Sequence, residues 1–184
     1  RNMAFGYQVL GFGSGGGAQP IEVDYLVVAG GGAGIYGGGG AGGYRTSFPG
    51  GTKLTLEGGG AIPITVGAGG VSAPPNAIAR PGTLSTLATT ASPISSSGGG
   101  GSCPVISVPD GCPAAAQGQP GGSGGGSDAL IGGGAPGIGN KGGYPTPEGS
   151  NGGIGYGFAG QACSENGGGG GGAGGTGGNG MGPY

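Results

Sequence analysis

Apolar and polar side chains alternate near the start of the chain. In IEVDYLVVA (21–29), Val23, Tyr25 and Val27 fall on one face, and the even-numbered residues, which include Leu26, fall on the other. A period of two residues is the pattern of a strand with one buried face. The spacing therefore predicts a strand over 21–29, with Val23, Tyr25 and Val27 on one face and Glu22, Asp24 and Leu26 on the other.

Three further segments show a weaker strand pattern. The lead segment 1–20 has alternating aromatic and aliphatic residues, which indicates a short strand that docks on a neighbouring subunit. KLTLE (53–57) and AIPITV (61–66) are expected to pair with each other. Pro63 lacks an N–H group, so it restricts the second of these strands to a sheet edge or a bulge.

Alternation stops beyond residue 70. Residues 71–97 are rich in Ser, Thr, Ala and Pro and read as a loop, and 98–184 is glycine punctuated by single side chains. The chain therefore divides into a joining segment (1–20), a β and glycine-rich segment (21–70), a loop (71–97) and a glycine array (98–184). No α-helix is expected, because glycine costs about 1 kcal/mol per helical position relative to alanine.

The array contains a three-residue period. Between residues 167 and 180, Ala173, Thr176 and Asn179 recur every third position, and the intervening positions are glycine. Three residues per turn is the period of the left-handed polyproline II conformation, whose N–H and C=O groups point outward and need partners. Because glycine has no Cβ, such rods can approach closely enough to bond one another. The predicted fold is mostly β and irregular, with short N-terminal strands followed by a bundle of polyglycine II helices.

Composition supports a fold without a conventional core. Glycine contributes 61 of the 184 residues, against a usual share of about 7%. Collagen is excluded because the 15 prolines are dispersed and glycine lacks the strict Gly-X-Y spacing. Disorder is the ordinary alternative for such a composition, but only 12 residues are charged, which disfavours a self-repelling coil.

Charge and histidine content restrict the function. The five basic residues are well separated and the net charge is −2, so we expect no nucleic-acid partner. No apolar run reaches membrane-spanning length, so no membrane insertion is expected. With no histidine and no recognisable carboxylate pair, we expect no enzyme, no cofactor and no metal site. GGGAGIYG (30–37) imitates a dinucleotide-binding motif, but the glycines that follow it cannot form the required helix.

The sequence does not determine whether the three cysteines are oxidised or reduced. Cys103 and Cys112 flank a Pro-Asp-Gly turn, so they are a candidate disulfide in an oxidising compartment. They are free thiols if the protein is assembled in a cytoplasm. If Cys103 and Cys112 form the disulfide, Cys163 is left unpaired or pairs between chains.

Five aromatic residues are candidates for surface recognition. They are Tyr36, Tyr44, Tyr144, Tyr156 and Phe158, all in glycine-rich surroundings. One interpretation is that they form a thin hydrophobic layer over the glycine lattice. The other is an exposed aromatic surface that binds a carbohydrate or a partner chain.

The segments 21–34 (IEVDYLVVAGGGAG), 37–47 (GGGGAGGYRTS) and 61–70 (AIPITVGAGG) resemble, in this order, the glycine-rich domains of tailed-bacteriophage fibres. The resemblance implies a virion component, a tail-fibre or fibre-tip domain with stacked polyglycine II rods, on the particle surface. It also implies a homo-oligomer that joins other subunits through its N-terminal segment. The host partner would be a surface glycan or an outer-membrane protein.

Two other functions are compatible with a glycine lattice. One is a non-viral extracellular or cell-surface filament subunit. The other is an ice-binding protein, but this would need Thr and Ala to recur on one face over many turns. Only the short run of Ala173, Thr176 and Asn179 does so.

Overall fold

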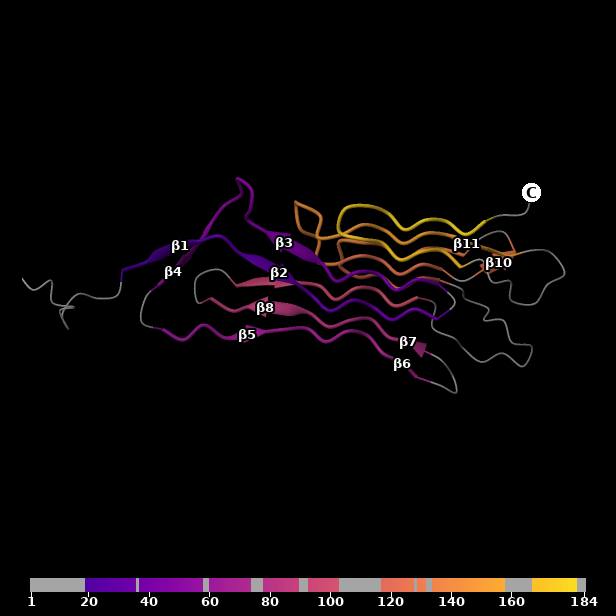
Figure 1. Cartoon of the computed structure of the whole chain (residues 1–184), viewed down its shortest axis with the longest axis horizontal. Coiled ribbons are helices and arrows are strands. Elements are labelled where there is room, and N and C mark those ends of the chain that lie inside the picture. Colours follow the sequence, from indigo (N-terminus) through magenta and orange to yellow (C-terminus); the bar gives the residue numbers. More distant parts are fainter. Residues whose placement is uncertain are drawn as a thin grey trace, which may run out of the picture.

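The computed structural model of the protein describes nine stretches of the chain. Within them there is no helix, and eleven short strands form five small sheets, so the described chain is mostly β and irregular structure, as predicted. Long, nearly straight backbone segments run side by side along the long axis (Figure 1). The described residues are 19–35, 37–57, 60–73, 78–89, 93–102, 117–127, 129–131, 134–157 and 167–181.

Each strand is two or three residues long. Four sheets are antiparallel, namely β1–β4, β2–β3, β6–β7 and the three-stranded β5–β8–β9, and the pair β10–β11 is parallel. The strands are β1 (Ile21–Val23), β2 (Leu26–Val28), β3 (Tyr44–Thr46), β4 (Leu54–Leu56), β5 (Ile64–Thr65), β6 (Ser72–Ala73), β7 (Ile78–Ala79), β8 (Ser85–Leu87), β9 (Ile94–Ser96), β10 (Ala129–Ile131) and β11 (Gly155–Gly157).

The segment 21–29 forms two strands instead of the single one predicted. The chain changes partner between them, since β1 pairs with β4 and β2 pairs with β3. The predicted faces are nevertheless confirmed. Val27 is buried and Val23 and Tyr25 pack against it, whereas Leu26 is 61% exposed.

The predicted pairing of 53–57 with 61–66 is wrong. β4 pairs with β1 in the register Ile21 to Leu56, and β5 pairs with β8. The pairing with β1 lets Leu54 enter the core beside Val27, whereas Ile64 of β5 stays 70% exposed. The prediction for Pro63 holds, because β5 is an edge strand of its sheet.

The segment 71–97, expected to be a loop, contributes β6, β7, β8 and β9. Small hydroxyl side chains make this possible, since Ser85 and Ser96 are buried in β8 and β9 and pair directly in the antiparallel register. The pairing partners of these four strands are distant in sequence or have weak strand propensity. The local sequence pattern therefore did not reveal the strands.

The hydrophobic core is small and lies where the sheets meet. Val27, Leu54 and Ile94, from β2, β4 and β9, are buried together, and Val23, Tyr25, Leu56 and Leu87 pack around them. Among the described residues of the glycine-rich part, the buried hydrophobic side chains are the small ones of Ala29 and Ala79. That part is held by its backbone.

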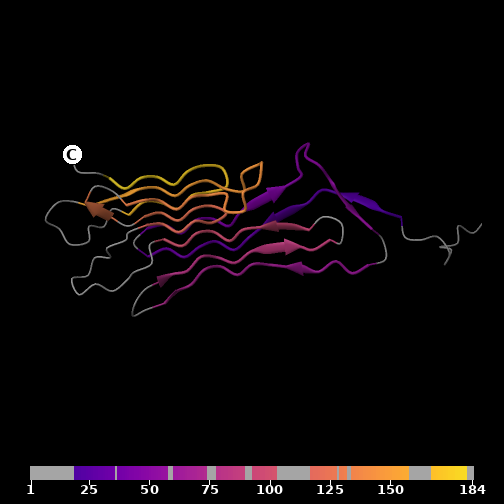
Figure 2. The same ribbon diagram turned by 180° about the vertical axis from the view of Figure 1, so that it is seen from behind.

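We call the glycine-rich segments that lie side by side the glycine bundle. Hydrogen bonds between backbone groups join each segment to several others, both parallel and antiparallel. The segments extend away from the β1–β4 end of the molecule (Figure 2). The glycine bundle comprises 29–35, 37–43, 67–71, 79–83, 97–102, 117–127, 134–140, 149–155, 167–172 and 174–181.

Hydrogen bonds within the glycine bundle repeat every three residues. From the segment 29–35, one pair of N–H groups three positions apart donates to 37–43, and a second such pair donates to 79–83. The bonds are Ala29 N to Gly43 O (3.1 Å), Gly32 N to Gly40 O (2.8 Å), Gly30 N to Thr83 O (3.1 Å) and Ala33 N to Arg80 O (3.0 Å). Each segment therefore directs a backbone hydrogen-bonding group toward a given neighbour at every third residue.

Glycine is needed in the bundle because the closely packed backbones leave no space for a side chain. A Cβ on Gly42 would overlap with the carbonyl oxygen of Ala29, and a Cβ on Gly124 would overlap with that of Gly137. Among the described glycines, only Gly50 and Gly143 have a left-handed φ, and both lie in loops outside the bundle. The close approach of backbones, rather than an unusual backbone conformation, excludes larger residues.

The last segment, 174–181, forms an edge of the bundle. Ala173, Thr176 and Asn179 are all exposed, whereas the N–H groups of Gly177 and Gly180 donate inward to the segment 149–155. The Asn179 side chain also bonds the neighbouring segment, because its Oδ1 accepts from Ile154 N (2.9 Å), and Gly174, Gly175 and Gly178 are exposed as well.

Candidate binding groove

An open groove lies where the sheets meet the glycine bundle. One wall comes from Tyr25 and β3 with the following loop, and the other comes from the loop 144–147. The groove has a volume of about 560 Å³. Its lining residues are Tyr25, Tyr44, Arg45, Thr46, Gly51, Thr52, Tyr144, Pro145, Thr146 and Pro147.

Glu148 anchors the loop that forms the second wall. Its side chain is 1% exposed. Oε1 accepts a hydrogen bond from Gly142 N (2.9 Å), and Oε2 accepts bonds from Ser97 N (2.8 Å) and Ser96 Oγ (3.2 Å). A buried carboxylate needs such donors to offset its lost hydration. Because the donors come from the loop itself and from β9 and its next residue, Glu148 ties the loop to the bundle.

The main chain of Glu148 also reaches the first wall. Its carbonyl oxygen accepts a hydrogen bond from Tyr44 N (2.7 Å), at the start of β3. This hydrogen bond joins the two walls directly.

Asn140 closes the loop 140–148 on itself. Its φ of 54° lies in the left-handed region, which asparagine tolerates better than most residues. Its side chain bonds both main-chain groups of Tyr144, donating to O (3.0 Å) and accepting from N (3.2 Å). These bonds fix the position from which the Tyr144 ring enters the groove.

Arg45 and Tyr144 meet across the groove. The guanidinium carbon lies 3.8 Å from the centre of the Tyr144 ring, a cation–π arrangement. Nη1 donates to the carbonyl oxygen of Ser95 (3.0 Å), and the Ser95 hydroxyl is 3.0 Å from the Tyr144 hydroxyl. The three residues orient one another.

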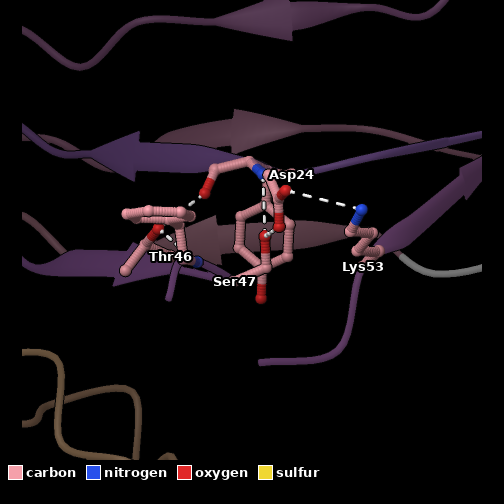
Figure 3. A network of polar contacts seen from close by, with 6 residues as sticks. Asp24, Thr46, Ser47 and Lys53 are labelled. Atoms are coloured by element: carbon pink, nitrogen blue, oxygen red, sulfur yellow. Dashed lines mark hydrogen bonds and ion pairs between the residues drawn. The ribbon is translucent and has the colours of Figure 1, made fainter. Parts of the chain in front are cut away.

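A polar network behind the first wall holds Tyr25 and Thr46. Ser47 Oγ donates to Asp24 Oδ1 (2.8 Å) and accepts from Tyr25 N (3.0 Å), while Thr46 Oγ1 donates to Tyr25 O (2.8 Å). Lys53 lies on the other side of the Asp24 carboxylate, with Nζ 3.8 Å from Oδ2 (Figure 3). The Asp24 carboxylate is therefore engaged by Ser47 and Lys53.

The structure brings together two of the five predicted recognition aromatics. Tyr44 and Tyr144 line the same groove. Tyr156 is half-buried in β11, which lies well away from β3 along the long axis (Figure 1). Tyr36 and Phe158 lie outside the described residues, as do the candidate disulfide residues Cys103 and Cys112.

Tyr25, Arg45 and Glu148 were not predicted from the sequence as parts of this site. Tyr25 was predicted only to share a strand face with Val23 and Val27, and it is half-buried and lines the groove. Arg45 directly follows a candidate aromatic residue, which is a signal that could have included it. No sequence pattern around Glu148 indicates its role in the site, because its hydrogen-bond partners come from both β9 and its own loop.

The fold and the groove define a class of protein: a glycine-rich domain whose backbone segments bond laterally beside a small β region, with an aromatic groove between the two. The chain belongs to the family described as the glycine-rich domain, whose sequence model matches residues 17–184. No curated protein and no solved structure matches the chain significantly. Among the described residues, no helix could cross a membrane and no cluster of three potential metal ligands is present.

Proposed function

We propose that the glycine bundle is a lattice of polyglycine II helices and that the chain is a structural component of a virion, a tail-fibre or fibre-tip domain. The observation that carries the proposal is the three-residue repeat of hydrogen-bond partners along the bundle segments. A left-handed helix with three residues per turn presents each neighbour with one N–H group per turn. In a β-strand, the hydrogen bonds to one neighbouring strand would repeat every two residues.

A lattice of this kind suits a thin, exposed appendage. Its backbone bonds run between segments that lie along the long axis, so it needs no thick hydrophobic core (Figure 1). The few buried side chains of the bundle are small, such as Ser102, Ser123 and Ser127. Exposed loops and the groove are then available to contact a host surface, which is the role that the resemblance to phage fibre domains implies.

Assembly with other subunits is part of the proposal. The segment 1–20 would join the chain to further copies or to other virion proteins. Deleting residues 1–18 in the encoding phage should then yield particles that lack the chain. Incorporation of the shortened chain at the normal level would contradict this part.

The lattice can be tested by nuclear magnetic resonance. Scalar couplings across hydrogen bonds identify each donor and acceptor directly. We expect couplings from Gly126 N to the carbonyl of Gly38 and from Ser123 N to that of Ala41, two bonds three residues apart on both segments. Couplings that alternate with a period of two would overturn the helical interpretation.

The virion role needs a separate experiment. An antibody against the purified chain should label particles from a lysate of the encoding organism, with gold at a fibre or tail tip in electron micrographs. Label on cellular filaments and none on particles would instead favour the non-viral surface filament. A particle fraction without the chain in mass spectrometry would also contradict the proposal.

A further inference from the structure

We propose that the groove between β3 and the loop 144–147 binds an acidic saccharide, a sugar that carries a carboxylate. The inference rests on the proposed function, since it names the ligand class through which an exposed domain of this kind would recognise a surface. It is argued from three properties of the groove: its aromatic rings, its single cation and its hydroxyl groups.

The rings provide apolar surfaces for a sugar. Tyr44 is 43% exposed, and Tyr25 and Tyr144 are half-buried with parts of their surfaces facing the groove. Tyrosine combines an apolar ring with a polar hydroxyl, so it packs against the C–H face of a pyranose and still bonds its hydroxyl groups. Pro145 and Pro147 add rigid apolar surface to the opposite wall.

Arg45 supplies the charge that selects for a carboxylate. A guanidinium has five N–H donors in one plane. Within the described chain, the hydrogen bond of the Arg45 side chain is the one from Nη1 to Ser95 O, so the other donors are available. The Tyr144 ring, whose centre is 3.8 Å from the guanidinium carbon, restricts the position of the guanidinium. A carboxylate can therefore accept two parallel hydrogen bonds from a preoriented donor pair.

The charges around Arg45 favour one anionic group over a polyanion. None of the residues that line the groove is acidic, and the carboxylate of Asp24, behind the first wall, is engaged by Ser47 and Lys53. Glu148 directs its oxygens to Gly142, Ser96 and Ser97. Arg45 is also the one basic residue in the lining, which fits a sugar with one carboxylate better than a phosphate backbone.

Size and rigidity fit a small saccharide. A volume of about 560 Å³ lies within the range of roughly 300–1,000 Å³ typical of small-ligand sites. Thr52 and Thr146 place two exposed hydroxyl groups at the rim, where sugar hydroxyls can bond them. The walls are held by Glu148 and Asn140, so little ordering is required on binding.

The test compares acidic glycans with neutral counterparts of the same stereochemistry. The purified chain is titrated by isothermal calorimetry with methyl galacturonoside and sialyllactose, which carry one carboxylate each. The neutral counterparts are methyl galactoside and the methyl ester of sialyllactose. We expect at least one acidic glycan to bind about tenfold or more tightly than its neutral counterpart, because only the acid makes the charge-assisted bonds to Arg45. Added salt should weaken that preference.

Two variants and a matched control locate the site. Arg45→Gln should remove the preference for the acidic glycan, and Tyr44→Ala should weaken binding of both members of the pair. Arg80→Gln removes the same charge from an exposed residue outside the groove lining and should bind like the unchanged chain. Unchanged thermal unfolding and amide spectra establish that the variants are folded.

Several outcomes would overturn the inference. They are equal affinity for the acidic and neutral partners, no binding of either acidic glycan at millimolar concentration, and tighter binding of a sugar phosphate than of the carboxylated sugar. Equal losses in Arg45→Gln and Arg80→Gln would show a general charge effect. These results concern the purified chain alone. The virion localisation is tested independently by the antibody labelling and mass spectrometry.

Discussion

Gly126 lies so close to Gly168 that a Cβ on the former would overlap with the carbonyl oxygen of the latter. The two residues belong to antiparallel segments of the glycine bundle, joined by bonds such as Gly168 N to Ser127 O (2.9 Å). The contact is between backbones, and neither segment can move away without breaking its bonds to other neighbours. Such contacts explain why glycine orders this part of the chain.

Gly126→Ala should therefore destabilise the protein strongly. The added methyl group has no space, and overpacking of this kind costs about 3 kcal/mol or more in free energy of unfolding when the backbone cannot yield. Chemical denaturation measures the loss. Gly178→Ala is the matched control, because a Cβ there meets nothing within 4 Å. It should change stability by less than about 1 kcal/mol. Equal losses in the two variants would contradict the close-packed bundle.

Two buried serines of the bundle should respond differently to alanine. Ser127 Oγ donates to Gly134 O (2.9 Å) and accepts from Gly155 N (2.8 Å), so Ser127→Ala should cost about 1–3 kcal/mol. Ser123 Oγ is buried without a hydrogen-bond partner among the described residues. Ser123→Ala should therefore be neutral or stabilising when measured by the same thermal unfolding assay. A larger loss at Ser123 than at Ser127 would show that these bonds do not form.

Glu148→Gln should loosen the second wall of the groove. An amide NH₂ would replace one of the two oxygens that now accept bonds from Gly142 N and Ser97 N. One N–H group would then lose its acceptor, at a cost of about 1–3 kcal/mol. Calorimetric unfolding gives the cost, and shifts of the Tyr144 amide signal report the altered loop. Glu57→Gln, at an exposed position, should leave both readouts unchanged. A silent Glu148→Gln variant would contradict the anchoring role.

Gly143→Ala should be unfavourable for a conformational reason. Its φ is 65°, in the left-handed region, although a Cβ would meet nothing within 4 Å. Placing alanine there costs about 1–2 kcal/mol. The same substitution at Gly174 has equal space and no left-handed φ, so it should be tolerated. Thermal unfolding of the pair separates backbone strain from steric overlap, and a stabilised Gly143→Ala variant would contradict the loop geometry.

Part of the groove followed from the sequence and part did not. Tyr44 and Tyr144 were recognisable as large side chains isolated among glycines, and both line the groove. Their proximity was not predictable, because the bonds that bring them together run from Tyr44 N to Glu148 O and from Arg45 to Ser95. No local pattern encodes contacts between segments so far apart in the chain.

By itself, the sequence determined the kind of backbone structure. Its glycine content disfavours α-helices, the alternation at 21–29 sets which side chains share a face, and the spacing of Ala173, Thr176 and Asn179 gives the three-residue period of the array. Only the tertiary structure decided which segments became neighbours, including the pairing of β4 with β1 and of β5 with β8. The physical reason is that backbone hydrogen bonds between glycines are chemically alike, so a glycine segment has no local preference for one partner over another. Register and neighbours are fixed by the few side chains that fit a single arrangement, such as Leu54 in the core and Glu148 beside β9.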